Sequence, residues 1–130
     1  LSVKHEANPV VDAETLFRAR KMVDGVYLDD KLKGYLVDVV LATRQPDRYG
    51  ASELSAFIRF GASPRATISL ALASKAVAFM NGRSFVTPQD IKDVGLDVLR
   101  HRVIVSYEAE AEDVSSDDII QKIFETVPVP

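Results

Sequence analysis

The chain has 130 residues, the size of about one domain, of which 47% are hydrophobic and 27% charged. Sixteen Lys and Arg residues against nineteen Asp and Glu residues give a net charge of −3, which argues against a general nucleic-acid-binding protein. Cysteine is absent, so disulfides and thiolate ligands are excluded. The two histidines, His5 and His101, form no zinc-binding spacing, and we expect no metal site.

The beginning of the chain shows no targeting segment. No signal-peptide pattern opens it, and no apolar run reaches the ~18 residues that cross a membrane. The first residue is Leu1 rather than Met. We therefore expect a cytoplasmic protein without a membrane span, of which this sequence is an excised or processed piece.

The first half of the chain predicts two helices and a loop. Asp12 is an N-cap candidate for a helix over residues 12–23, and Gly25 after it allows a left-handed end. A second helix over residues 30–43 follows Asp29 or Asp30 as a cap. Its apolar positions recur at helical spacing and predict one buried face, made by Leu32, Tyr35, Leu36, Val39, Val40 and Thr43. Residues 44–50 read as a loop, and residues 53–60 as one or two helical turns.

The third helix has clear boundary signals. Ser63 is an N-cap candidate, Pro64 suits the first helical position, and Asn81-Gly82 ends the helix. Its apolar residues lie on more than one face, which predicts a central helix that packs on several sides. One face holds Ile68, Leu72, Ala76 and Phe79, and another holds Leu70, Ala73 and Val77.

The last third predicts two further helices. Thr87-Pro88-Gln89-Asp90 starts a fourth helix, interrupted at Gly95 and resumed through Leu99. Residues 103–105 look extended, with residues 84–86 as a candidate partner strand, and the acidic residues 108–113 read as a solvated loop. Ser115 opens a last helix, which ends before Pro128 and has the apolar stripe Ile119, Ile120, Ile123 and Phe124. The predicted fold class is all-α, with at most one tiny β pairing.

A complete nucleotide-hydrolysis site is missing from this sequence. The six glycines stand at positions 25, 34, 50, 61, 82 and 95; no two are five apart and none precedes Lys, which excludes a P-loop. No apolar run ending in paired acids provides a Walker B strand, and the pair Asp117-Asp118 is typical of a helix start. We therefore expect this chain by itself to hydrolyse no ATP.

Arg65 is the unusual residue, because Ser63 and Pro64 place it in the first turn of a helix. A cation there opposes the helix dipole by ~0.3–1 kcal/mol. The same helix end favours anions, and a guanidinium can make a two-pronged contact to an oxyanion. Arg65 is either a ligand-facing residue that meets an anion or a surface arginine paired with a nearby acid.

Several segments bear on this choice. Residues 61–66 (GASPRA), followed by a long Ala/Leu-rich helix, resemble the sensor 2 region of MoxR-type AAA+ ATPases. Further segments resemble that family in the same order: 35–44 (YLVDVVLATR), 81–91 (NGRSFVTPQDI), 98–103 (VLRHRV) and 127–130 (VPVP). The match covers about residues 26–130 and is specific as a combination, although the V-T-P-x-D part is also a general helix start. Residues 47–60 form a longer loop than in many members.

The resemblance implies an AAA+ lid-type helical bundle at residues 26–130. Residues 1–25 are then a connecting segment and first helix, and the large nucleotide-binding domain is absent from this chain. Arg65 would be the sensor 2 arginine, catalytic in the parent ATPase because it reaches the γ-phosphate of ATP. Ser63, Pro64 and Ala66 would complete the ATP-binding segment. ATP with Mg²⁺ would be held mainly by the missing domain.

The resemblance also implies partners. These are the upstream nucleotide-binding domain, neighbouring subunits in a ring of about six, and a von Willebrand A-type protein. The implied function is to couple ATP binding and hydrolysis to chaperone-like assembly or activation of partner complexes. Arg44, Arg83 and Arg102 also match family positions; Arg44 and Arg102 fit interdomain or intersubunit contacts, or a plain interaction with a helix C-terminus.

The alternative is a non-enzymatic helical interaction or DNA-binding domain. A row of basic residues along one helix would favour DNA, whereas an isolated Arg65 at an edge would favour the lid. His101 fits a buried or hydrogen-bonded polar residue, and Tyr49 and Phe60 fit core or interface aromatics.

Overall fold

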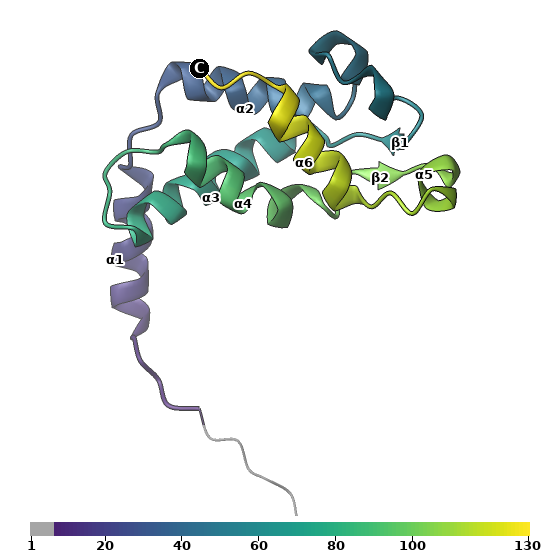
Figure 1. Cartoon of the computed structure of the whole chain (residues 1–130). Helices are drawn as coiled ribbons and strands as arrows, with labels where there is room; N and C mark the ends of the chain where they lie inside the picture. Colours follow the sequence, from purple (N-terminus) through teal and green to yellow (C-terminus); the bar gives the residue numbers. More distant parts are fainter. Residues whose placement is uncertain (1–6) are drawn as a thin grey trace, which may run out of the picture.

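Six α-helices and a two-stranded sheet follow one another in this computed structural model, which describes residues 7–130 (Figure 1). The helices are α1 (Ala13–Asp24), α2 (Asp30–Ala42), α3 (Arg65–Met80), α4 (Pro88–Leu99), α5 (Tyr107–Ala111) and α6 (Ser116–Thr126). Two 3₁₀ turns, η1 (Pro46–Tyr49) and η2 (Ser52–Leu54), precede strand β1 (Ile58–Phe60), and strand β2 (Ile104–Val105) follows α4. The predicted all-α class with one tiny β pairing is confirmed; His5 lies outside the described residues.

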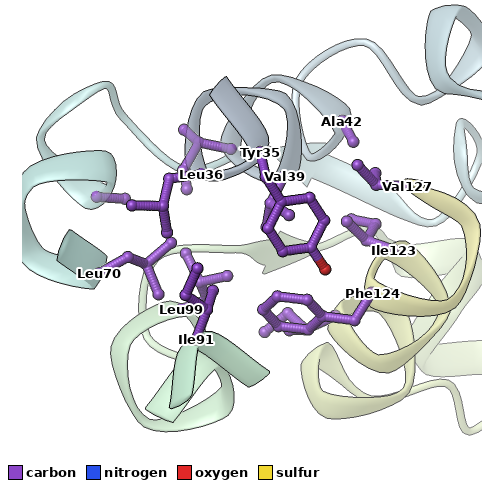
Figure 2. Close-up of a cluster of buried hydrophobic side chains, with 14 of the residues drawn as sticks. Tyr35, Leu36, Val39, Ala42, Leu70, Ile91, Leu99, Ile123, Phe124 and Val127 are labelled. Atoms are coloured by element: carbon purple, nitrogen blue, oxygen red, sulfur yellow. The ribbon is translucent and has the colours of Figure 1, made fainter. Parts of the chain in front are cut away.

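The core lies between α2, α3, α4 and α6. Figure 2 shows Tyr35, Leu36 and Val39 of α2 among apolar side chains of the other three helices. Those partners are Leu70 of α3, Ile91 and Leu99 of α4, and Ile123 and Phe124 of α6. All six predicted face residues of α2 and all four of the α6 stripe are buried, because both stripes repeat at helical spacing.

The helix starts follow the predicted capping residues. The Asp12 carboxylate accepts a hydrogen bond from Thr15 N–H at 2.7 Å, and Asp29 caps α2 in the same way. α4 and α6 begin with reciprocal capping boxes, Thr87 with Asp90 and Ser115 with Asp118. These side chains satisfy N–H groups that have no partner within the helix. The second capping box confirms the reading of residues 117–118 as helix-start acids.

α4 is continuous, so the predicted interruption at Gly95 is wrong. Gly95 is buried where α4 crosses α6, and a Cβ at this position would lie 2.3 Å from the ring of Phe124. The glycine therefore permits close packing of the two helices rather than breaking one of them. The capping box at Thr87 and the hydrogen bonds of the helix outweigh the weak helix preference of one glycine.

The strand pairing also differs from the prediction. β2 pairs antiparallel with β1, with Ile58 opposite Val105 and Phe60 opposite Ile104. Residues 53–60 therefore begin in one 3₁₀ turn, within the predicted one or two helical turns, but end in a strand. Residues 84–86 pair elsewhere: Tyr27 N–H donates to Ser84 O at 2.8 Å, and Val86 N–H donates to Tyr27 O at 2.9 Å. These bonds use the backbone groups that the predicted pairing required.

Two further local predictions are wrong. The acidic stretch 108–113 is not only a loop, because the Ser106 hydroxyl accepts from Ala109 N–H and starts the short helix α5. Gly25, at the end of α1, has φ −77° and is right-handed, so no left-handed cap forms there. α1 extends away from the bundle in Figure 1, and none of its residues is buried.

Candidate functional site around Arg65

The segment before α3 is fixed to the end of α2. Thr43 is fully buried, and its hydroxyl accepts a hydrogen bond from the Ala62 backbone N–H at 2.9 Å while donating to the Val40 carbonyl at 2.6 Å. The Arg44 guanidinium donates to the Ala62 carbonyl at 3.3 Å. Both polar groups of the Ala62 backbone are therefore held by the Thr-Arg pair that ends α2.

Gly61 makes this contact sterically possible. A Cβ at Gly61 would lie 2.2 Å from the Thr43 carbonyl oxygen, so a residue with a side chain does not fit without moving the backbone. The sequence showed Thr43-Arg44 and the segment 61–66 as two separate motifs. Their direct contact, and the role of the Thr43 hydroxyl, were missed, because a hydrogen bond across 19 residues leaves no local pattern.

α3 starts in a different way from the prediction for Ser63. Pro64 has helical dihedrals, φ −55° and ψ −25°, as a first helical residue should. The start has no side-chain cap, so the predicted N-cap bond of the Ser63 hydroxyl is not made. Instead the Ser63 carbonyl accepts from Ala66 N–H at 2.8 Å, and Ala66 is fully buried.

Arg65 is exposed at this helix start. Within residues 7–130 its guanidinium has no ion pair and no hydrogen bond, whereas the paired arginines of this chain contact aspartates: Arg83 with Asp90, and Arg100 with Asp97 and Asp117. The first turn of α3 contains no acid either. Arg65 is thus a cation at the positive end of a helix with no acidic partner among the described residues.

An apolar face adjoins Arg65 on α3. Ile68 and Leu72 follow Arg65 at intervals of three and four residues and are 62% and 53% exposed, so the predicted packing is wrong at these two positions. Phe79 of the same predicted face does pack against the core. A cavity of about 670 Å³ runs beside Ile68 and Leu72, and another of about 460 Å³ separates Leu72 from Leu16 of α1. The side of α3 that holds Leu70 and Ala78 is therefore buried, whereas the described residues leave Ile68 and Leu72 exposed.

Arg83 and Arg102, which also match family positions, have structural partners. Arg83 forms a two-pronged ion pair with buried Asp90, whose pKa is lowered to about 2 by that contact and by hydrogen bonds from Thr87, against the raising effect of burial. The Arg102 Nε donates to the Val98 carbonyl at 2.7 Å, in the last turn of α4, which is the helix C-terminus interaction.

The remaining candidates are placed as follows. His101 is exposed, and its side chain makes no hydrogen bond within residues 7–130, so neither the buried nor the hydrogen-bonded position expected for it is found. Tyr49 packs against the core and donates to Asp38 at 3.2 Å, whereas Phe60 is 60% exposed. Across residues 7–130 we find no group of three or more His, Asp or Glu side chains that could hold a metal ion. None of the helices from α1 to α6 has the length and apolarity needed to cross a membrane.

Comparisons with known proteins identify the family of this chain. A family model described as the AAA lid domain matches residues 51–123, more than half of the chain. The chain is 34% identical over 125 residues to the chaperone MoxR1 of Mycobacterium tuberculosis and 34% identical over 112 residues to protein MoxR of Paracoccus denitrificans. It covers 33% of each of these relatives, while the matches cover 96% and 82% of this chain.

A solved structure has the same fold. The crystal structure of a proposed ATPase from Cytophaga hutchinsonii superposes with a TM-score of 0.87 at 40% identity, over 90% of this chain and 36% of that one. The chain thus spans about a third of the length of the relatives it matches. It belongs to the AAA lid domain family and is the helical lid of a MoxR-type AAA+ protein.

Proposed function

We propose that this lid acts as the sensor 2 element of an ATPase, with Arg65 as the residue that meets the γ-phosphate of ATP. The observation that supports this most is the combination of an exposed, unpaired Arg65 with a rigid support at Thr43 and Ala62. A guanidinium held in place can donate two parallel hydrogen bonds to phosphoryl oxygens. It stabilises the charge that develops on these oxygens during transfer, without reorganising at that moment.

The exposed side of α3 provides a place for a nucleotide-binding domain. Ile68 and Leu72 lie on the same side of the helix as Arg65, and the adjoining cavities reach Leu16 of α1. Exposed apolar area of this kind is a site for contact with another domain. Docking of the large domain here brings its nucleotide towards Arg65, and loss of the γ-phosphate then changes the angle between the two domains.

ATP and Mg²⁺ fit this lid only as a partial site. The free guanidinium of Arg65 suits a phosphate, whereas the described residues offer no acidic cluster for the metal. In our proposal the large domain holds Mg²⁺ and most of the nucleotide, while Ser63, Pro64 and Ala66 form the turn that sets the direction of Arg65. The isolated lid then hydrolyses no ATP.

The biological role that we propose rests on the name of one relative. This relative is named a chaperone, and we propose that the parent of this chain couples ATP turnover to assembly or activation of a partner complex. A ring of about six subunits and a von Willebrand A-type partner belong to this proposal. DNA binding is the weaker alternative, because α3 has only Arg65 and Lys75 as basic residues.

The test is ATP hydrolysis by the full-length protein that contains this lid. Arg65→Gln should lower kcat by about 100-fold or more, as removal of one transition-state donor does. Arg18→Gln, which removes another exposed arginine on α1, serves as the matched control and should leave kcat unchanged. Circular dichroism of both variants checks the fold. Wild-type turnover by the Arg65→Gln protein would refute the sensor assignment.

A further inference from the structure

Three arginines without ion pairs line a cavity beside the segment that leads into α3. The cavity has a volume of about 440 Å³ and lies between the end of α2, η1 and β1. Its charged lining residues are Arg44, Arg48, Arg59 and Asp47. Arg65 does not line it, so this cavity is distinct from the proposed sensor position.

The charges around the cavity are unbalanced. Three arginines and one aspartate line the cavity, a net charge of +2, and the Asp47 carboxylate already accepts a hydrogen bond from the Ser55 hydroxyl at 2.7 Å. None of the three arginines forms an ion pair with another residue of the described chain. Like charges held together without a counter-ion repel one another, and a bound anion relieves that repulsion.

The three lining arginines differ in the contacts that their guanidinium groups already make. The Arg59 guanidinium lies over the rings of Phe60 and Tyr107, at 5.4 and 6.0 Å from their centres. Arg44 donates to the Ala62 carbonyl at 3.3 Å. Arg48 projects from η1 and has no side-chain hydrogen bond within residues 7–130, which leaves its five N–H donors for a ligand.

We propose that this cavity binds a phosphate-type oxyanion, either free or as part of a nucleotide. A doubly charged phosphate group balances the excess of two positive charges, and its tetrahedral oxygens can accept from guanidinium groups on different sides. The amide of Gln45 is a further neutral donor in the lining. The volume lies within the usual range for a small-molecule site.

Such an anion acts on the segment that leads into α3. Arg44 contacts both the cavity and the carbonyl of Ala62, three residues before Arg65. An anion that draws the Arg44 guanidinium towards the cavity weakens its bond to Ala62 and changes the support of the α3 start. The site is thereby a means of regulating the lid separately from ATP hydrolysis.

The experiment is a calorimetric titration of the 130-residue chain, which has a hydrophobic core of its own, with inorganic pyrophosphate at near-physiological salt. We expect saturable binding that Arg48→Gln weakens by about tenfold, the loss of one charged two-pronged contact. Arg59→Gln should weaken it as well, whereas Arg18→Gln should change the Kd by less than about twofold. Arg48 and Arg18 are both exposed, so neither change threatens the fold.

Three outcomes of the pyrophosphate titrations would overturn the proposal. These are no saturable binding, equal weakening by Arg18→Gln, and loss of binding on Arg65→Gln instead of Arg48→Gln. Succinate that binds as tightly as pyrophosphate would also contradict a phosphate site. A parallel titration with ADP separates the sources: tighter binding than pyrophosphate identifies a nucleotide, and equal binding identifies the free ion. Both of these last results support the site, and neither depends on the sensor role of Arg65.

Discussion

The buried hydroxyl of Thr43 accepts the backbone N–H of Ala62 at 2.9 Å, across 19 residues of sequence. This bond joins the last turn of α2 to the segment that sets the direction of α3, and therefore of Arg65. Because Thr43 is fully buried, no water is available to replace it. The position of Arg65 thus depends on a contact that is remote in sequence.

Replacement of Thr43 by valine should destabilise the lid. Valine keeps the shape but leaves the buried Ala62 N–H without an acceptor, which costs about 1–3 kcal/mol. Urea unfolding of the chain followed by circular dichroism measures this difference. Thr43→Ser keeps the hydroxyl and is the matched control, with a smaller loss from the missing methyl group. Equal stability of the valine variant and the wild type would show that the Thr43 bond contributes nothing.

The ion pair between Arg83 and Asp90 should make stability depend on acid pH. The pKa of Asp90 is lowered from 3.8 to about 2 in the folded chain, and the hydrogen bond from Arg83 is the largest cause. Because this pKa is lowered in the folded state, the ionised Asp90 contributes its full stabilisation above about pH 4. This stabilisation is lost as the pH falls towards 2. The lowering of the Asp90 pKa from 3.8 to about 2 corresponds to about 2 kcal/mol of stability.

Arg83→Gln should therefore lower the free energy of unfolding by about 3 kcal/mol at pH 7, because Asp90 is left charged and buried. The gap between variant and wild type should shrink below pH 4. The exposed pair of Arg100 with Asp117 is the control, and Arg100→Gln should cost less than about 1 kcal/mol. A gap that is constant from pH 7 to pH 2 would exclude titration of Asp90 as its cause.

Two helical glycines should respond oppositely to alanine. Gly95→Ala places a methyl group against the Phe124 ring and should cost about 1–3 kcal/mol. Gly34, inside α2, has no atom within 4 Å of a Cβ, so Gly34→Ala should stabilise the chain by about 0.5–1 kcal/mol. Thermal unfolding of the two variants compares them directly. Stabilisation by both alanines would show that α4 and α6 do not pack closely at Gly95.

The elements that the sequence predicted best are those whose signals are local. The face of α2 and the stripe of α6 recur at helical spacing, and the caps Asp12, Thr87 and Ser115 stand directly beside the amides that they bind. The start of α3 and the exposure of Arg65 were also predictable, because Pro64 fixes the first turn.

The errors concern contacts between remote segments. Gly95 was read as a helix break, because only the position of Phe124, nearly thirty residues later, explains it. The partner of β2 was misplaced for the same reason, since β1 has three residues and no periodicity to reveal it. The exposed side of Ile68 and Leu72 has the same pattern as a core face, and sequence periodicity does not tell which partner covers it.

The most direct measurement of the sensor 2 role is the preference of the full-length protein for a non-hydrolysable ATP analogue over ADP. The two nucleotides differ at the γ-phosphate. The Kd for ADP divided by the Kd for the analogue therefore reports the contacts to that group. Arg65→Gln should reduce this ratio by about tenfold, with the Kd for ADP nearly unchanged, and Arg18→Gln should leave both values as in the wild type. An unchanged ratio in the Arg65→Gln protein would contradict the assignment of Arg65 to the γ-phosphate.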